Sequence, residues 1–435
     1  TPTNAIKYTL SMWAKRSNTF AGDSNYLASV WVDGNNHWCM RFNDDQLNIY
    51  DYISSSVTTE LKTNRKFRDP SAWYHIVYVY DSANVTAGDR QKIYVNGVEE
   101  TSFATDTNPG SSAASVLNVS GRVLTLGARN SASYFEGQMA HVHFADGQAY
   151  APTVFGEVDS TSGIWIPKNS PTVTYGTNGF FLKFASGASG TDSSGNSNDF
   201  AVTGNLTSPK DNPENNFCNM NPLDNYYAQY VYSNANQTIT NGGSKGFATA
   251  TMGLSSGLWY WEMKPTAEPG GAYSLIGIAD EPTQGTGASN YLGYTATEWG
   301  YFGIDGAVRT NQNSPAYGNT WASGDIIGVY LDLNANKLYF SKNGTLQNSG
   351  TGVSITAPAS TTNGYYFPAT GYNDTSASVY NHNFGQGYFG TTAVSTAVAD
   401  AGGEGQFEYD PSAGTFDGSS KDFRAICTNN LATYG

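Results

Sequence analysis

Apolar and polar residues alternate along most of this chain, in short runs separated by stretches rich in Gly, Asn and Ser. In the first run, Tyr8, Leu10 and Met12 fall on one face of an extended segment, because successive side chains of a strand point to opposite sides. Residues 73–80 are apolar on both faces, which is typical of a central strand in a sandwich sheet. No helical period of useful length is found. The pattern therefore predicts an all-β protein.

Two Asn-Gly pairs mark predicted hairpin turns. Asn96-Gly97 follows a strand-like run at 92–95, and Asn343-Gly344 follows another at 337–341. Both central residues of a type I′ turn need a positive φ, which Asn and Gly adopt more readily than other residues. Each pair therefore predicts two antiparallel strands that are neighbours in a sheet.

Two stretches of small polar residues interrupt the strand pattern. Residues 187–198 are rich in Gly, Ser, Asn and Asp, and residues 208–213 contain two prolines. Such compositions are typical of linkers and exposed loops. We therefore predict two β-sandwich (jelly-roll-like) domains in tandem with a short C-terminal tail. The predicted parts are residues 1–168 (first sandwich), 169–216 (linker and connecting strands), 217–390 (second sandwich) and 391–435 (tail).

The charge balance excludes two kinds of partner. The 435 residues carry 22 Lys and Arg against 36 Asp and Glu, which gives a net charge of −14. Such a chain lacks the basic surface that nucleic-acid binding requires, and anionic lipid surfaces repel it. No apolar run approaches the roughly 18 residues of a membrane helix. We expect neither nucleic-acid binding nor membrane insertion.

The cysteines and one histidine are expected in the cores. Cys39, Cys218 and Cys427 are too few and too far apart for a disulfide framework or a zinc site, so we interpret them as small buried apolar residues. His75 lies within the strongly apolar run at 73–80 and is interpreted as a core histidine with satisfied hydrogen bonds.

The second block resembles a SPRY domain. The resemblance implies a twisted two-sheet sandwich that binds partners through its loops and is not itself catalytic. It is carried by seven separated motifs in the family's order, at residues 257–262, 276–279, 300–302, 324–332, 338–344, 367–369 and 383–385.

The first block resembles the concanavalin-A-like, laminin-G-like sandwich. Relatives often carry an acidic residue where this chain has Ala140, so no calcium site is transferred to that position. The motifs that carry the resemblance are residues 8–13, 73–77, 93–97, 126–127 and 135–142.

The two blocks in tandem resemble proteins of tailed phages, especially marine ones. Residues 215–223 and 422–431 share this resemblance. In those proteins such modules sit on tail fibres or other virion appendages, which implies a location on the surface of an extracellular particle. The chain has no initiator Met and strand-like sequence begins almost at once, at Ile6, so we expect a processed product or a segment of something longer.

Sandwiches of the first type include glycoside hydrolases, so a pair of carboxylates would be the sign of catalysis. Retaining hydrolysis needs two carboxyl groups about 5–5.5 Å apart. The nearest pattern is Glu408-Tyr409-Asp410, immediately before Pro411, and it favours a solvated turn. No nucleophile elbow, phosphate loop or dinucleotide-binding motif occurs. The chain is therefore predicted not to be an enzyme and to need no cofactor.

Two places in the sequence carry residues that could ligate a metal. Asp44, Asp45 and Asp51 could hold calcium through hard oxygen ligands, but a turn with exposed acids is the favoured interpretation. His141 and His143 alternate on one strand face, at a spacing that could chelate a metal, but no third ligand follows nearby. Packing inside the sandwich or against a neighbouring subunit is favoured, and no metal is predicted.

Loops of the second block are the predicted binding site. Sugars are recognised by stacking on aromatic faces, while amide and carboxylate groups hold the hydroxyls. The tyrosines of this set lie in Gly- and Asn-rich surroundings and are expected to be exposed, whereas the two tryptophans are also candidates for the core. The predicted ligand-binding residues are Tyr291, Tyr294, Trp299, Tyr317, Trp321, Tyr372, Asn373 and Asp374.

These observations favour a non-enzymatic virion appendage protein, similar to a tail fibre, that binds a host-surface glycan or protein. A homo-oligomer, with a trimer favoured, would raise the effective concentration of weak sites. Two alternatives stay open. The chain could be a capsid decoration or connector subunit that contacts only other virion proteins. It could also be a glycan-cleaving enzyme whose carboxylates converge from distant strands.

Overall fold

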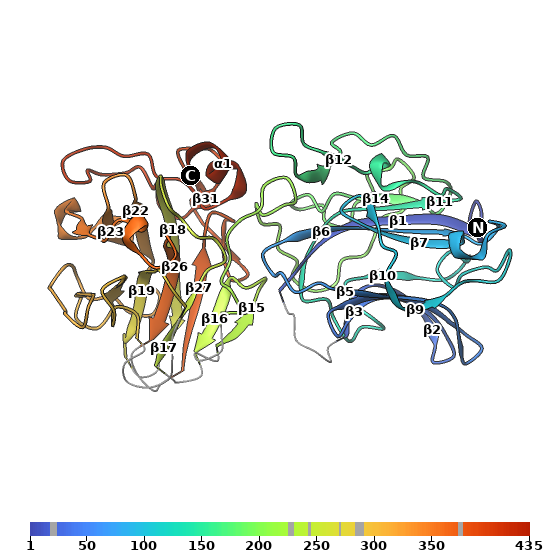
Figure 1. The fold of residues 1–435 in the computed structure, drawn as a ribbon, viewed down its shortest axis with the longest axis horizontal. Helices are drawn as coiled ribbons and strands as arrows, with labels where there is room; N and C mark the ends of the chain where they lie inside the picture. Colours follow the sequence, from blue (N-terminus) through green and yellow to red (C-terminus); the bar gives the residue numbers. More distant parts are fainter. Residues whose placement is uncertain (18–23, 225–229, 242–244, 269–270, 283–290, 373–376) are drawn as a thin grey trace. The chain divides into compact units, whose positions relative to one another are not determined.

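The computed structural model describes residues 1–17, 24–224, 230–241, 245–268, 271–282, 291–372 and 377–435 (Figure 1). The chain divides into two compact units, Thr1–Ser208 and Pro209–Gly435. Most of the segment predicted as a linker therefore belongs to the first unit, where residues 180–182 add a strand to a sheet. No helix in the described part of the chain is long and apolar enough to cross a membrane.

The first unit is a sandwich of two six-stranded antiparallel sheets. One sheet has the order β14-β11-β1-β6-β7-β8, with β14 Phe180–Leu182, β11 Gly137–Asp146, β1 Lys7–Arg16, β6 Trp73–Asp81, β7 Gln91–Val95 and β8 Val98–Glu99. The other has the order β10-β2-β3-β4-β5-β9, with β10 Leu124–Leu126, β2 Ser24–Asp33, β3 Asn36–Asn43, β4 Gln46–Ile53, β5 Ser56–Lys66 and β9 Phe103–Thr107. A small hairpin joins β12 Gly156–Val158 to β13 Trp165–Pro167, and 3-10 turns lie at Ala87–Asp89 and Pro152–Val154.

The core of the first unit confirms the strand pattern. Tyr8, Leu10 and Met12 are fully buried between the sheets, as their alternation predicts. β6 lies between β1 and β7, which is the central place expected for a strand that is apolar on both faces. The predicted type I′ geometry is also confirmed, because Asn96 and Gly97 have φ values of 49° and 81°.

A bulge in β11 breaks the alternation predicted for Met139 and the two histidines that follow it. Ser11 pairs with His143, but Trp13 pairs with Ala140, so the register shifts by one residue. His141 occupies the bulge with φ 47°. The prediction that Met139, His141 and His143 share one face is therefore wrong for Met139, which packs on the core between the sheets. His141 and His143 do share a face, because both contact the ring of Phe181, at 6.0 and 3.8 Å between ring centroids. Past the bulge His143 packs on Phe181 at 3.8 Å between ring centroids, which is the packing role that was favoured over metal binding.

The second unit is also a two-sheet sandwich. Its eight-stranded sheet has the order β15-β16-β27-β18-β22-β23-β24, and β25 also pairs with β23. These strands are β15 Val231–Ser233, β16 Thr238–Asn241, β27 Ser378–Asn383, β18 Leu258–Ala267, β22 Ile327–Asp332, β23 Lys337–Lys342, β24 Thr345–Leu346 and β25 Val353–Ser354. The five-stranded sheet has the order β17-β26-β19-β20-β21, with β17 Gly246–Thr249, β26 Phe367–Tyr372, β19 Ser274–Ala279, β20 Glu298–Phe302 and β21 Val308–Arg309. Further 3-10 turns lie at Asn348–Gly350 and Pro358–Ser360.

The C-terminal residues form a third layer rather than a loose tail. Phe407, Phe416 and Phe423 are fully buried, and they pack on Tyr330 and its neighbours on the face of the eight-stranded sheet that points away from the main core. This C-terminal layer contains β28 Tyr388–Phe389, β29 Thr392–Ala393, β30 Val398–Ala399, β31 Gln406–Phe407 and the helix α1 Thr428–Tyr434. The helix is too short to give a periodic signal, and the sequence did not predict it.

A buried carboxylate fastens the C-terminal layer to the sheet. Glu262 of β18 has no exposed surface, and its carboxylate accepts hydrogen bonds from the backbone N–H groups of Glu408 and Tyr409 at 3.0 and 2.9 Å. The Tyr260 hydroxyl and the Asn383 amide donate to the same group at 3.0 and 3.1 Å. Burial raises the pKa of Glu262 to about 7, although these four donors act in the opposite direction.

Candidate functional site

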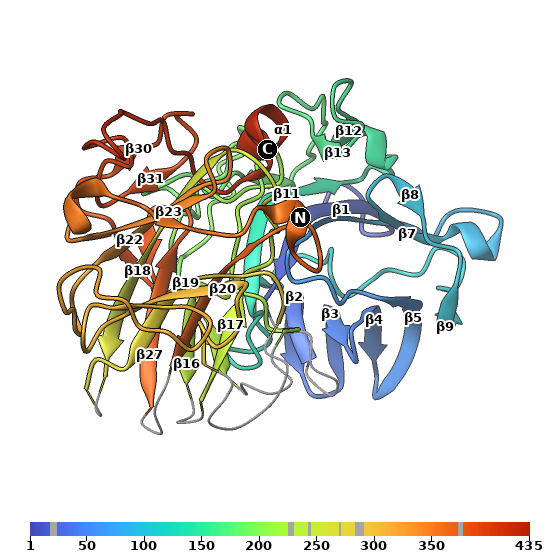
Figure 2. The ribbon, with the colours of Figure 1, turned by 60° about the vertical axis from the view of Figure 1, so that its left-hand side comes forward.

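One face of the first unit carries an aromatic and polar surface. β3 places Trp38, Met40 and Phe42 in the core. Figure 2 shows β2, β3, β4 and β5 side by side in one sheet. The alternate residues of β3, with their register partners on the neighbouring strands, therefore face away from the core. We call this surface the β2–β5 platform. It consists of Tyr26 and Trp31 of β2, His37 and Arg41 of β3, Asn48, Tyr50 and Tyr52 of β4, Glu60 of β5, and Arg129 from the loop after β10.

Three rings of the platform stack in a row across the strands. Trp31 pairs with His37, which pairs with Tyr52. The ring centroids lie 4.6 Å apart for Trp31 and His37 and 4.8 Å apart for His37 and Tyr52. Trp31 and Tyr52 are half-buried, so each leaves part of its ring accessible. His37 is buried between the other two rings, so the accessible apolar surface of the row is at its ends, on Trp31 and Tyr52. Accessible aromatic surface of this kind can pack against the apolar face of a sugar.

Two guanidinium groups lie on the rings of the platform. Arg41 and Arg129 both donate to the hydroxyl oxygen of Tyr26, at 2.9 and 2.8 Å. Arg129 also lies over the rings of Tyr26 and Trp31, with its guanidinium carbon 5.1 and 4.8 Å from their centroids. Arg41 lies 5.2 Å from the ring centroid of Tyr50. Tyr26 is almost completely buried, so it gives both guanidinium groups a rigid aromatic contact.

A short polar chain completes the platform. The Nε group of Arg41 donates to the Asn48 side-chain oxygen at 3.2 Å, and the Asn48 amide donates to Glu60 at 2.8 Å. Burial lowers the pKa of His37, and the positive charges of Arg129 and Arg41 lower it further. Asn48 is buried, so it positions Arg41 and Glu60 rather than meeting a ligand itself. Arg41, Glu60 and Arg129 are half-buried, and such polar groups beside aromatic rings can hold sugar hydroxyls.

The acidic residues nearest the β2–β5 platform lie on different faces of the sheet. Glu60 is the one carboxylate among the platform residues, whereas glycoside hydrolysis uses two. The nearest acid along β4 is Asp51, which faces the core and accepts the backbone N–H of Val116 at 2.7 Å. It is therefore not placed to act with Glu60 on the same face.

A buried serine–histidine pair in the first unit lacks the proton arrangement of a nucleophilic dyad. The Oγ atom of Ser11 lies 2.8 Å from Nε2 of His75. The indole N–H of Trp165 donates to Nδ1 of His75 at 2.9 Å, so the proton of the neutral ring is on Nε2 and points to Ser11. Burial lowers the pKa of His75 to about 3. His75 is thus a core histidine with both nitrogens bonded, which confirms its prediction.

The acids considered for calcium serve the fold instead. Asp44 and Asp45 form the predicted turn, with φ values of 52° and 62°. The prediction that these acids are exposed is wrong for Asp45 and for Asp51. Asp45 is buried because Arg16 and Arg68 pair with it at 3.0 and 2.9 Å, and Asp51 is fully buried on the core side of β4. Within the described ranges, no three His, Cys, Asp or Glu side chains are gathered as a metal site would need.

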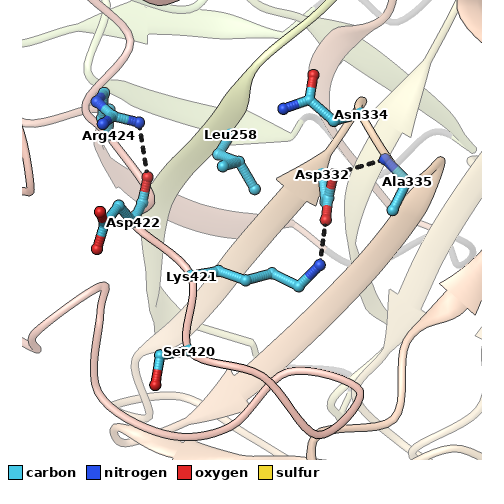
Figure 3. Close-up of a pocket in the computed structure, with 8 residues that line it drawn as sticks. All are labelled: Leu258, Asp332, Asn334, Ala335, Ser420, Lys421, Asp422 and Arg424. Atoms are coloured by element: carbon cyan, nitrogen blue, oxygen red, sulfur yellow. Dashed lines mark hydrogen bonds and ion pairs between the residues drawn. The ribbon is translucent and has the colours of Figure 1, made fainter.

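The second unit has a groove of about 620 Å³ along the C-terminal layer. Figure 3 shows Leu258 between two charged sets of residues. On one side Lys421 pairs with Asp332 at 2.5 Å, and on the other Arg424 donates to the backbone oxygen of Asp422 at 2.8 Å. These charged groups already bind one another. The groove therefore marks the contact between the C-terminal layer and strands β18 and β22.

Comparison with known proteins identifies both units. Residues 2–154 match the family model of the concanavalin A-like lectin/glucanases superfamily, and residues 258–387 match the model of the SPRY domain. The chain therefore contains a concanavalin A-like domain and a SPRY domain. Both family resemblances read from the sequence are confirmed.

The chain is also similar to individual curated proteins over parts of its length. The chain is similar to Ran-binding protein 9 of Xenopus tropicalis, with 29% identity over 144 residues that span 33% of this chain and 24% of that protein. It is also similar to the dual specificity protein kinase splA of Dictyostelium discoideum, with 30% identity over 113 residues, or 26% of this chain and 4% of that protein. The chain thus spans less than a quarter of the length of these two relatives.

Among solved structures, the chain is similar to the SPRY domain of human HERC1. That match has 19% identity and a TM-score of 0.31, and it covers 38% of this chain and 96% of the HERC1 domain. A similarity to stonustoxin has 18% identity and a TM-score of 0.29, and it covers 38% of this chain and 27% of the toxin chain.

Three of the predicted ligand-binding residues lie in the core of the SPRY domain. Trp299, Tyr317 and Trp321 are only 4%, 8% and 2% exposed, and they pack between the two sheets. Their prediction as ligand contacts is therefore wrong. The physical reason is that the space between the sheets needs large side chains, so aromatic residues that follow Gly- and Asn-rich sequence fill it.

Two predicted residues lie on the outer face of the five-stranded sheet. Tyr291 and Tyr294 are half-buried, and their rings meet edge to face at 5.7 Å. The Glu298 carboxylate accepts the backbone N–H groups of Gly293 and Tyr294 at 3.0 Å each, which fixes this loop on the sheet. Tyr291 and Tyr294 form a second, smaller candidate surface.

The remaining predicted residues cannot be compared with the structure. Asn373 and Asp374, and the side chain of Tyr372, lie outside the described residues. The backbone of Tyr372 ends β26 and pairs with Ser274 of β19.

Proposed function

We propose that this chain is a non-enzymatic binding protein whose concanavalin A-like domain holds carbohydrate on the β2–β5 platform. The observation that carries the proposal is the row of Trp31, His37 and Tyr52 beside two cations and a carboxylate. Exposed ring faces bind the C–H face of a sugar, and the polar groups around them select among hydroxyl patterns.

We further propose that the protein is part of a virion appendage, similar to a tail fibre, and that it attaches a phage to its host. The tandem order of the two domains and the sequences at 215–223 and 422–431 support this assignment, because they resemble phage appendage proteins. A homotrimer would present three platforms to one surface, which multiplies weak binding through effective concentration. The SPRY loops would add contacts to a host or virion protein.

A glycan array tests the binding function. We expect the full chain to bind a subset of the array, and Trp31→Ala to reduce that binding about tenfold or more, since truncating an aromatic anchor costs about 2 kcal/mol. The matched control is Tyr94→Ala, which removes a half-buried ring from β7, outside the platform. A blank array, or equal loss in both variants, would refute the function.

Electron microscopy of the parent particle tests the location. Gold-labelled antibody against the chain should mark fibres or another appendage. Label on the capsid together with a blank glycan array would favour the decoration or connector function instead. Particles without label would contradict the virion assignment altogether.

A further inference from the structure

We propose that the loop of residues 127–136, between β10 and β11, is a second glycan contact of the concanavalin A-like domain, and that Tyr134 binds a neutral sugar ring there. This inference rests on the proposed function, because the loop contains Arg129 of the β2–β5 platform and would extend the same binding surface.

The first argument is the exposure of Tyr134. This residue is 64% exposed, which is the largest value for an aromatic residue in the described part of the chain. Its hydroxyl donates to the backbone oxygen of Ser131 at 2.8 Å, and no other ring and no cation of the described residues lies on its ring. Most of the ring is therefore available to the C–H face of a sugar.

The second argument is that the loop holds this ring in place. Arg129 and Ala132 exchange backbone hydrogen bonds of 3.0 and 2.9 Å, and both residues between them have positive φ, as in a type I′ turn. Ser133 also has a φ of 50°, which is unfavourable for residues other than glycine. The N–H of Phe135 then donates to the backbone oxygen of Gly127 at 2.8 Å. A ring fixed in this way loses little conformational entropy when a ligand binds.

The third argument is the chemistry around the ring. Asn130, Ser131 and Ser133 are exposed, and their side chains have no hydrogen-bond partner among the described residues. Tyrosine, serine and asparagine also dominate antibody binding loops, where the ring supplies contact area and the small polar groups supply adaptable hydrogen bonds.

The charge of the loop favours a neutral ligand. Between residues 129 and 134 the one ionised side chain is that of Arg129, and its guanidinium already lies over two rings of the platform. The free groups beside Tyr134 are thus uncharged hydroxyls and an amide. These groups suit the hydroxyls of a neutral hexose, which combines them with an apolar ring face.

The experiment compares variants of Tyr134 on a glycan array that carries neutral and acidic oligosaccharides. We expect the full chain to bind neutral members, and Tyr134→Ala to bind the strongest of them tenfold or more weakly in isothermal titration. Tyr134→Phe keeps the ring and loses the hydroxyl bond, so its affinity should stay within about threefold of that of the unsubstituted chain. Because the side chain is mostly exposed, Tyr134→Ala should melt within about 2 °C of the unsubstituted chain.

Val123→Ala is the matched control, because Val123 is 76% exposed in the same unit and lies outside the loop. It should leave glycan binding unchanged. Neutral-glycan binding that is unchanged in Tyr134→Ala would overturn this inference alone, and so would binding restricted to acidic glycans. Equal losses in Tyr134→Phe and Tyr134→Ala would contradict binding through the ring. A blank array would overturn the proposed function together with this inference.

Discussion

The C-terminal layer should be part of the cooperative fold of the SPRY-containing unit, and Phe423→Ala tests this. Phe423 is fully buried, and its ring centroid lies 4.8 Å from that of Phe416 and 5.2 Å from that of Tyr330. Truncating a buried Phe to Ala costs about 3–5 kcal/mol through lost burial and the cavity left behind. We expect a loss of about 4 kcal/mol, because the ring is enclosed and its partners are themselves large.

Scanning calorimetry of the full chain measures this effect. For a unit of about 150–250 residues, each kcal/mol shifts the melting temperature by about 2–4 °C, so the transition of the second unit should fall by about 8–16 °C. The transition of the first unit should stay in place, because the two units are compact separately. Leu223→Ala is the control, since that side chain is 56% exposed and its loss should cost less than about 0.5 kcal/mol. A shift below about 2 °C for Phe423→Ala would refute the cooperative layer.

Three further predictions concern a buried acid, a hairpin glycine and the buried cysteines. Because the pKa of Glu262 is raised from 4.5 to about 7, the folded protein keeps a proton that the unfolded chain loses, so the stability of the second unit should fall as pH rises from about 4.5 to about 7. Melts at several pH values should show a smaller fall for Glu262→Gln, and identical slopes would contradict the argument. In urea titrations, Gly97→Ala should destabilise the first unit more than Gly121→Ala. The backbone strain is similar, because φ is +81° at Gly97 and +79° at Gly121. Only at Gly97, however, would the added Cβ collide with a ring, because it would lie 2.8 Å from Trp165. The three buried cysteines should resist a thiol reagent until the protein unfolds, and rapid reaction of the native chain would refute their burial.

The strands and turns could be predicted from sequence because their signals are local. Alternation fixed the face of Tyr8 and Leu10, and the pair Asn343-Gly344 adopts the predicted positive φ values of 48° and 77°. The bulge at His141 could not be predicted, because one extra residue in a strand leaves no mark in an apolar–polar pattern. Long-range pairing alone reveals it.

The candidate site was harder to predict than the fold. The platform residues are the outward halves of ordinary amphipathic strands, and only the register brings Trp31, His37 and Tyr52 into one row. The sequence did carry a signal for this surface. His37 and Arg41 alternate with core residues on β3, and outward-facing side chains of this size and polarity can indicate a binding surface. Conversely, Trp299 looked like a loop residue but lies inside β20, where its ring faces the core.

The C-terminal layer also sets where the chain can be cut. The SPRY family match ends at residue 387, yet the aromatic side chains that cover Tyr260, Tyr330 and Tyr339 come from residues beyond it. A recombinant fragment trimmed to the family boundary would bare a broad aromatic sheet face to water, and such faces promote aggregation. The practical unit for expression and crystallisation therefore extends to the last residue, Gly435.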